Sequence, residues 1–187
     1  MPATQTAESE SDLINRAQQG DRDAFSELVR SHYPGVVRVI YRLCGDAGLA
    51  EDAAQETFIK AWQHLASFRP GTSLKSWLYR IGANTALDAL RRGRNAPLDF
   101  EAVGAEDSSA GPEEALLQKE RSRTVQAAIL SLSEANRTIL VLREYGGLSY
   151  AEIAAALDVP AGTVMSRLNY ARSRLRELLE PEFGEQA

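Results

Sequence analysis

Residues 149–176, with the sequence SYAEIAAALDVPAGTVMSRLNYARSRLR, decide the fold of the C-terminal part of this chain. Ser149 and Glu152 have the spacing of a capping box, which begins a helix. The residue before Pro160 avoids the α region, and Asp158 tolerates a left-handed turn, so this first helix ends here and a second begins directly after the proline. A short helix, a tight turn and a longer arginine-rich helix are typical of a helix-turn-helix that binds double-stranded DNA.

The second helix of this segment separates an apolar face from a polar face when its residues are placed about 100° apart. Val164 and Leu168 stand in the apolar sector, which we expect to face the protein. The opposite sector carries side chains suited to base edges in a major groove, and arginines flank it where phosphates would lie. This polar arc and its flanks consist of Gly162, Ser166, Asn169, Tyr170, Ser173, Arg172, Arg174 and Arg176. An amphipathic surface helix with a solvated basic face is the alternative, and Arg167 suits an ion pair as well as DNA.

Charge is unevenly distributed along the chain. The net charge is −5, which by itself argues against a nucleic-acid partner. Between Arg69 and Arg94, however, basic residues far outnumber the single acid, Asp88, whereas acids collect in 8–27 and 99–120. Two basic segments separated by an acidic one suit a protein that contacts nucleic acid at two points.

Cysteine usage and hydropathy favour a cytoplasmic protein. Cys44 is the only cysteine, so the chain can form no internal disulfide and offers no Cys/His metal cluster. We expect Cys44 to be a small buried hydrophobe, with a redox thiol as the alternative. No apolar run approaches the roughly 18 residues of a membrane span, and the N-terminus lacks a signal-peptide pattern. We therefore expect no membrane insertion and no bound cofactor.

The sequence offers no convincing catalytic set. His32 and His64 are the only histidines and have no Ser or Cys arranged as a partner nucleophile, so we expect surface or capping roles for both. Glu51, Asp52 and Glu56 lie close together on one predicted helix, but on its exposed face and without a histidine at metal-ligand spacing. The chain is not predicted to be an enzyme.

Helical periodicity recurs along most of the chain, which predicts an all-α fold of two small helical domains joined by a flexible linker. Between residues 93 and 112 the helical periodicity stops, and the sequence is rich in glycine, serine, proline and acids, which is typical of a linker. The predicted helices before the helix-turn-helix are 11–19, 21–32, 34–43, 49–66, 73–92, 113–130 and 133–146. The predicted organisation is a disordered tail at 1–10, a first domain at 11–92, a linker at 93–112, a second domain at 113–180 and a tail at 181–187.

Three stretches in this order resemble bacterial sigma factors. They are LAEDAAQETFIKAW at 49–62, SLKSWLYRIGANTALDALRR at 73–92, and LSEANRTILVLREYGGLSYAEIAAALDVPAGTVMSRLNYARSRLRE at 132–177. Within the RNA polymerase sigma factor family the resemblance is to the extracytoplasmic-function (ECF) group, which keeps only region 2 and region 4. It covers roughly residues 11–180.

The resemblance implies that the chain binds core RNA polymerase, through the β′ clamp helices and the β flap. The helix matching 49–64 docks on the clamp helices in that family. Residues of suitable spacing on its polar face are Asp52, Gln55, Glu56 and Lys60. An ordinary solvated face is the alternative for this set.

By the same resemblance, the helix at 73–92 and its preceding loop open the minus-ten promoter element and hold its non-template strand. Unpaired bases need stacking surfaces and a cationic track for the backbone. The residues that offer these in and before the helix are Phe68, Arg69, Lys75, Tyr79, Arg80, Asn84, Arg91 and Arg92. Trp77 lies on the buried stripe and is assigned mainly to the core.

In region 4 the resemblance assigns the minus-thirty-five element to the helix at 161–176. Met165, Ser166, Asn169 and Tyr170 match the base-reading positions, and Gly162, Thr163 and the arginines named above complete the expected set. Met165 departs from the basic residue of some members and cannot donate a hydrogen bond.

The function implied is promoter-specific initiation of transcription, with promoter DNA and core polymerase as partners and a dedicated anti-sigma protein as an expected regulator. A stand-alone helix-turn-helix repressor or activator is the alternative. Such a regulator would bind its operator without polymerase.

Overall fold

The computed structural model describes residues 9–69, 71–93 and 112–183, and within these ranges the chain is helical without a strand. The all-α prediction is confirmed, whereas most of the expected linker and of the N-terminal tail lies outside the described residues. The helices are α1 (Glu10–Gln18), α2 (Arg22–Cys44), α3 (Ala47–His64), the short 3-10 helix η1 (Leu65–Ser67), α4 (Leu74–Gly93), α5 (Pro112–Leu130), α6 (Glu134–Glu144), α7 (Tyr150–Leu157) and α8 (Ala161–Phe183).

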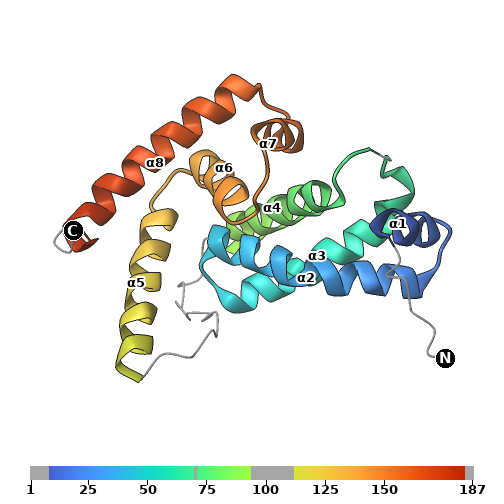
Figure 1. Ribbon diagram of the computed structural model, residues 1–187, viewed down its shortest axis with the longest axis horizontal. Coiled ribbons are helices and arrows are strands. Elements are labelled where there is room, and N and C mark those ends of the chain that lie inside the picture. The colour runs from blue at the N-terminus through green and yellow to red at the C-terminus, as the bar shows by residue number, and fades with distance from the viewer. Residues whose placement is uncertain (1–8, 70, 94–111, 184–187) are drawn as a thin grey trace, which may run out of the picture.

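Helices α1 to α4 with η1 form one helical unit, called the N-terminal unit below (Figure 1). Helices α2, α3 and α4 pack against one another, and aliphatic side chains such as Ile40 and Leu78 are fully buried between them. A Cβ at Gly82 would lie 3.3 Å from the Ile40 side chain. The glycine therefore lets α4 approach α2 closely.

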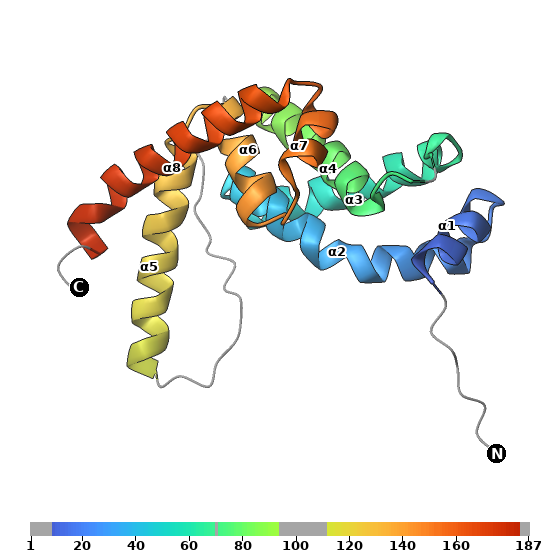
Figure 2. The same cartoon turned by 45° about the horizontal axis from the view of Figure 1, so that its top comes forward.

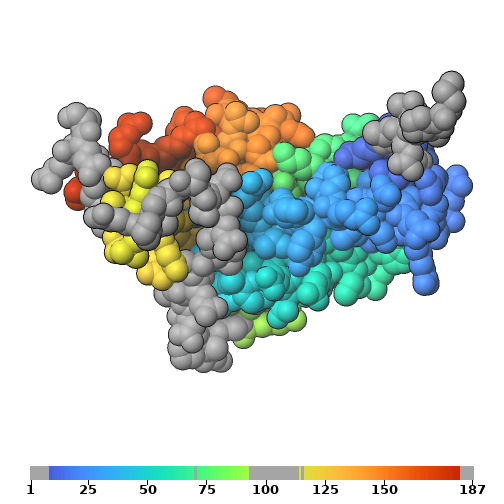
Figure 3. Space-filling model, turned by 60° about the horizontal axis from the view of Figure 1, so that its bottom comes forward, coloured from blue at the N-terminus to red at the C-terminus, as the bar shows by residue number. Residues whose placement is uncertain are grey.

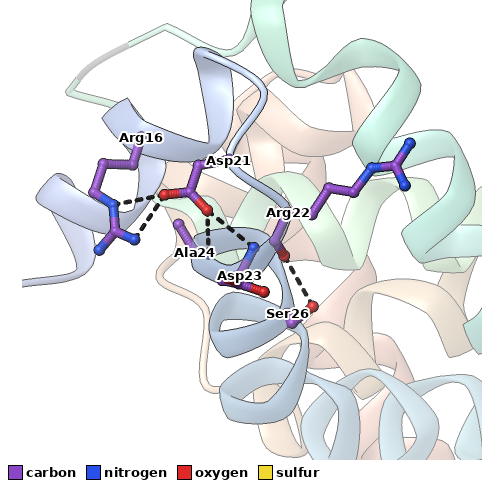
Figure 4. Close-up of polar contacts among 6 residues, drawn as sticks. All are labelled: Arg16, Asp21, Arg22, Asp23, Ala24 and Ser26. Atoms are coloured by element: carbon purple, nitrogen blue, oxygen red, sulfur yellow. Dashed lines mark hydrogen bonds and ion pairs between the residues drawn. The ribbon is translucent and has the colours of Figure 1, made fainter.

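The junction of α1 and α2 is organised by one carboxylate (Figure 4). Asp21 accepts hydrogen bonds from the backbone N–H groups of Asp23 (3.0 Å) and Ala24 (3.1 Å), which caps α2. The same side chain accepts from Nε and Nη2 of Arg16, at 2.9 and 2.6 Å. These bonds, that of Ala24 first, lower the pKa of Asp21.

Proline 34 does not separate two helices, contrary to the prediction of helices at 21–32 and 34–43. Helix α2 runs continuously through Pro34. The proline removes one backbone hydrogen bond, at a cost of about 3 kcal/mol or more in a helix interior. Leu28 before it and Val36 after it are both buried in the same core. Burial of one continuous apolar stripe offsets the missing bond.

Helices α5 to α8 form the C-terminal unit. Ile129, Leu140, Ile153 and Leu168, one from each helix, are fully buried in its core. Figure 2 shows that α5 and the C-terminal half of α8 extend away from the rest of the molecule. Helix α8 continues to Phe183, so it includes the first positions of the segment expected as a tail.

Both ends of α7 follow the sequence prediction, and a glycine precedes it. Ser149 Oγ accepts from the N–H of Glu152, and the Glu152 carboxylate accepts from the N–H of Ser149, which completes the capping box. Asp158 takes the left-handed conformation at φ 54° and ψ 50°. Gly147, at φ +66°, follows α6 and allows the reversal into α7.

The two units lie against each other. Figure 3 shows the surface of α6 and its neighbours directly beside α2 and α4. Helix α2 contacts α5 and α6, and α4 contacts α7. The buried apolar residues of both units form one continuous cluster. The sequence predicted two domains on a linker and did not predict this packing.

Candidate nucleic-acid interface

Helix α8 presents the polar arc that the periodicity predicted. Val164, Leu168 and Ala171 are fully buried against the C-terminal unit. On the other side Met165 and Tyr170 are 50% and 59% exposed, which is unusual for large apolar side chains. The predicted DNA-contacting residues Gly162, Ser166, Asn169, Arg172, Arg174 and Arg176 are exposed as well, and Thr163 is half-buried. The whole arc is therefore open to a major groove.

The arginines that flank this arc are held by exposed carboxylates. Nε and Nη2 of Arg172 donate to Glu144 at 3.1 and 2.6 Å, which raises the pKa of Arg172. Arg174 Nη1 donates to Glu177 at 2.9 Å. All four side chains are more than 40% exposed, and exposed ion pairs contribute little to stability. Phosphates can therefore replace these carboxylates at low cost.

Helix α4 carries the second basic face. Arg80 and Asn84 are one turn apart and exposed, as are Arg91 and Arg92 near the end of the helix. Exposed Arg69 and half-buried Lys75 lie before and near its start. Arg80, Asn84 and Arg91 share one side of α4, where their charge and hydrogen-bonding groups suit the backbone of a single strand.

The two aromatic rings expected to stack bases on this face are buried. Phe68 is 5% exposed, and its ring centroid lies 5.2 Å from that of Trp77, at the edge of the core. The prediction that Phe68 offers a stacking surface is therefore wrong, because its ring completes the packing of the N-terminal unit. Tyr79 is 4% exposed, and its burial raises its pKa. In this arrangement its ring lies beneath the C-terminal unit, so it has no face available to a base.

Helix α3 presents a mixed face beside an apolar groove. Asp52 and Gln55 are exposed, and the Glu56 carboxylate accepts a hydrogen bond from Lys60 at 2.7 Å, which lowers the pKa of Glu56. Ile59 stands in the middle of this polar face and is 58% exposed. Ile59 was not among the predicted contact residues, although an apolar residue in the centre of a polar helical arc indicates a binding surface.

The groove next to this face has a volume of about 420 Å³. Side chains of α2 and α3 line it, and nearly all of them are apolar or aromatic. They are Phe25, Val29, Tyr33, Phe58, Ile59 and Trp62, with Gln55 and Gln63 at the rim. An apolar groove beside an exposed isoleucine is suited to another protein surface.

Comparison with known families accounts for both units. Residues 28–96 match the model of Sigma-70 region 2, and residues 122–175 match that of Sigma-70, region 4. The chain is 40% identical to the RNA polymerase sigma-H factor of Pseudomonas aeruginosa, over 94% of this chain and 96% of that protein. It is 35% identical to the ECF RNA polymerase sigma factor SigW of Bacillus subtilis, over 89% of this chain and 94% of that protein. The chain belongs to the ECF sigma factors.

Two solved structures share the fold of most of the chain. CnrH in complex with the cytosolic domain of CnrY is 27% identical, with a TM-score of 0.73 over 94% of this chain and 99% of that one. The sigma factor RpoE in complex with the anti-sigma factor NepR, from Bartonella quintana, is 29% identical. Its TM-score is 0.69 over 84% of this chain and 98% of that one.

His32 and Cys44 of this sigma factor both lie in contacts that stabilise the fold. His32 Nε2 lies 2.9 Å from Glu10 Oε2, where it joins α1 to α2. Cys44 is 2% exposed, and burial raises the pKa of its thiol to about 11. Among the described residues, no group of three or more His, Cys, Asp and Glu side chains could hold a metal ion. No helix within the same ranges is long and apolar enough to cross a membrane.

Proposed function

We propose that this sigma factor divides promoter recognition between two helices and docks on core RNA polymerase with a third. Helix α8 reads the upstream duplex element, and α4 holds the non-template strand of the downstream element. The observation that supports this division most strongly is the exposed polar arc of α8 on a helix-turn-helix, in the same chain as the separate cationic track of α4. A stand-alone regulator binds only duplex DNA and needs no second surface for a single strand.

Polymerase docking is assigned to α3 and the groove beside it. Asp52, Gln55, Glu56 and Lys60 supply hydrogen bonds and charge, and Ile59 supplies apolar area next to the groove. Protein–protein interfaces combine an apolar centre with a polar rim. Because Ile59 is exposed, replacing it leaves the core of the N-terminal unit unchanged.

The variant Ile59→Lys tests this assignment. We expect it to weaken binding to core polymerase about tenfold or more, because it places a charge at the apolar centre of the interface. Ser31→Lys, at an exposed position on α2, is the control and should bind core polymerase normally. Equal affinity of the two variants would contradict docking through α3.

The sigma function itself is tested by native co-purification. A sigma factor binds core polymerase tightly and its promoter weakly when free. No association with core polymerase, together with tight sequence-specific DNA binding by the isolated chain, would support a stand-alone repressor or activator instead.

We also propose that a dedicated inhibitor protein regulates this chain in the cytoplasm, where polymerase acts. Two solved relatives of the same fold were determined in complex with a partner, CnrY for CnrH and the anti-sigma factor NepR for RpoE. Affinity capture from native cells should yield a stoichiometric small protein that competes with polymerase. Repeated recovery of polymerase alone would count against this regulator.

A further inference from the structure

We propose that Gln18 is a positioning residue for strand capture: it holds the turn that follows η1 and so fixes Arg69, the strand-binding residue that precedes α4. The proposal rests on the assignment of Arg69 to the non-template strand under the proposed function. Gln18 belongs to α1, which none of the three proposed binding faces includes. Helix α1 also precedes residues 28–96, which match region 2, so its role is not given by that match.

The side-chain amide of Gln18 reaches from the last turn of α1 to two backbone carbonyls. Its Nε2 donates to the carbonyl oxygens of Leu65 and Phe68, both at 2.9 Å. Only the NH2 end of an amide can face two acceptors, so both of its N–H groups are used here. The two carbonyls lie at the start of η1 (Leu65–Ser67) and directly after it. One side chain therefore sets the position of this short helix and of the residue that follows it.

Phe68 is fixed at its ring and along its backbone. The buried ring packs against Trp77, with 5.2 Å between centroids, and the Phe68 N–H donates to the Leu65 carbonyl at 3.0 Å. Gln18 holds the Phe68 carbonyl, which belongs to the same planar peptide unit as the N–H of Arg69. The orientation of that peptide unit determines the direction in which Arg69 leaves the core.

The turn beyond Phe68 is closed by its own hydrogen bonds. The Arg69 carbonyl accepts from the Thr72 hydroxyl at 2.7 Å and from the Thr72 N–H at 3.4 Å. Arg69 and Thr72 are exposed, and a Cβ at Gly71 would have no atom within 4 Å. Within the described ranges Arg69 makes no ion pair, so its guanidinium is available to a phosphate. The bond from Gln18 to Phe68 therefore joins this turn to another helix at the residue next to Arg69.

Helix α1 is a fixed support for this contact. Glu10 Oε2 lies 2.9 Å from His32 Nε2 at one end of α1, and Arg16 donates to Asp21 at 2.9 and 2.6 Å near the other. Helix α1 contacts both α2 and η1, and Figure 1 shows it beside the segment that joins α3 to α4. Because α1 is held to α2 at both ends, Gln18 ties the turn to the rest of the N-terminal unit.

Loss of this tie would leave Arg69 on a turn whose first peptide unit is not fixed. Fixing the backbone of one residue costs at least as much free energy as an exposed ion pair contributes. A phosphate contact of a loosened Arg69 would therefore form only part of the time. Gln18 thus acts on the strand through Arg69 and not through a contact of its own.

The first test measures the mobility of the turn in the full-length chain. A nitroxide on Arg69→Cys reports it, and Cys44 is 2% exposed with a thiol pKa raised to about 11, so it stays unlabelled. Adding Gln18→Leu should sharpen the spectrum by a mobile, nanosecond component. Gln19→Leu, the same replacement at the exposed next position, should leave the spectrum unchanged. Gln18→Asn is one methylene shorter and should act like Gln18→Leu, so it serves if that variant does not fold.

The second test measures strand binding by the holoenzyme. The probe is a labelled single-stranded oligonucleotide with the downstream motif of a promoter mapped by run-off transcription, and binding by core polymerase alone is subtracted. Arg69→Ala should flatten the slope of log affinity against log salt by about 0.7, as expected for one phosphate contact on a single strand. Gln18→Leu should flatten it by nearly the same amount, and the double variant no further. A purely structural role of Gln18 would lower thermal stability and leave the slope at its wild-type value.

Two results would overturn the proposal: an immobile label at position 69 in folded Gln18 variants, or losses of slope that add in the double variant. The proposed function fails separately. No binding of the strand beyond that of core polymerase, or a wild-type slope for Arg69→Ala, refutes the strand assignment of Arg69 and with it the functional role of Gln18. The label mobility in the free chain still decides whether Gln18 holds the turn.

Discussion

The α8 face and the α4 face are both basic, but their surroundings differ. On α8 the large side chains of Met165 and Tyr170 are exposed, and Arg172 and Arg174 pair with exposed carboxylates of their own unit. On α4 the large side chain of Tyr79 is buried, and Arg91 pairs with a carboxylate of the other unit. The face proposed to read duplex DNA is therefore exposed, whereas the face proposed to hold the single strand is partly buried.

This difference corresponds to the order of the two tasks. Duplex DNA is present before initiation, so a reader can be exposed at all times. Unpaired bases exist only after melting, which costs about 1–2 kcal/mol of stacking per step. A basic, aromatic face that was always open would bind any single strand. In this arrangement the burial of Tyr79 leaves only the polar and basic residues of the proposed strand-binding face exposed.

The largest effect is expected from substitutions on the proposed strand-binding face of α4. Asn84→Ala, or Arg80→Ala combined with Lys75→Ala, should suppress promoter melting about tenfold or more, because hydrogen bonds that involve a charged group are worth about 1.5–3 kcal/mol each and these side chains would hold the unpaired strand through them. Permanganate reactivity of thymines at the start site measures the melting. Binding to core polymerase and to the upstream duplex should stay near wild type.

A promoter opened beforehand by mismatches is the control for this prediction. It should restore transcription by these variants, since the cost of unstacking has been removed from the template. Normal melting by the variants, or no rescue on the mismatched template, would show that the α4 face is merely solvated.

The next effect concerns the phosphate contacts of α8. Arg172→Ala with Arg174→Ala should weaken binding to upstream duplexes of any sequence by about tenfold and flatten the slope of log affinity against log salt by about 0.9 for each lost contact. Fluorescence anisotropy over a salt series measures both quantities. An unchanged slope would mean that Glu144 and Glu177 retain these arginines in the complex.

A smaller and more selective effect is expected at a base-reading position. Asn169→Ala should cost about 1 kcal/mol or more on the preferred duplex, since bidentate base contacts are worth about 1–3 kcal/mol. It should cost much less on unrelated duplexes, in contrast to the arginine pair. Selection of bound sequences from a random pool measures this, and an equal loss on all sequences would show that Asn169 does not face the bases.

The smallest effect is a pH dependence of stability at Glu152. Hydrogen bonds, led by the Ser149 N–H and followed by the hydroxyls of Ser149 and Ser76, lower the pKa of Glu152 below its ordinary 4.5. The ionised Glu152 carboxylate therefore contributes fully to folding stability above pH 4.5, and this contribution is lost as the pH falls through the lower pKa of the folded state. Glu152→Gln should cost about 1 kcal/mol at pH 7 and less at pH 4. Urea unfolding at both pH values measures this, and an equal cost at both would contradict it.

Local features of this chain were predictable because local physics determines them. The capping box at Ser149, the left-handed Asp158 and the buried stripe of α8 depend on residues within a few positions of each other. The arc of α8 followed from helical periodicity, whereas the strand-binding set of α4 was implied by the resemblance to sigma factors.

Features that depend on distant contacts were not predictable in this way. Arg42 and Gln126 are 84 positions apart, and neither sequence neighbourhood signals the other. Phe68 and Tyr79 carry rings that suit a core and a stacking platform equally well, so composition could not distinguish the two roles. The continuity of α2 through Pro34 depends on packing against α3 and α4, which outweighs the local cost of the proline.

Run-off transcription on fragmented genomic DNA tests the sigma function and its division between two helices most directly. Core polymerase is assayed with and without this chain, and transcript starts are mapped by sequencing. We predict new starts that require the chain and share two upstream motifs at a fixed separation, and we expect Asn169→Ala to alter preference only in the distal motif. No chain-dependent starts, while the chain alone binds a specific duplex tightly, would contradict the account and identify a stand-alone regulator.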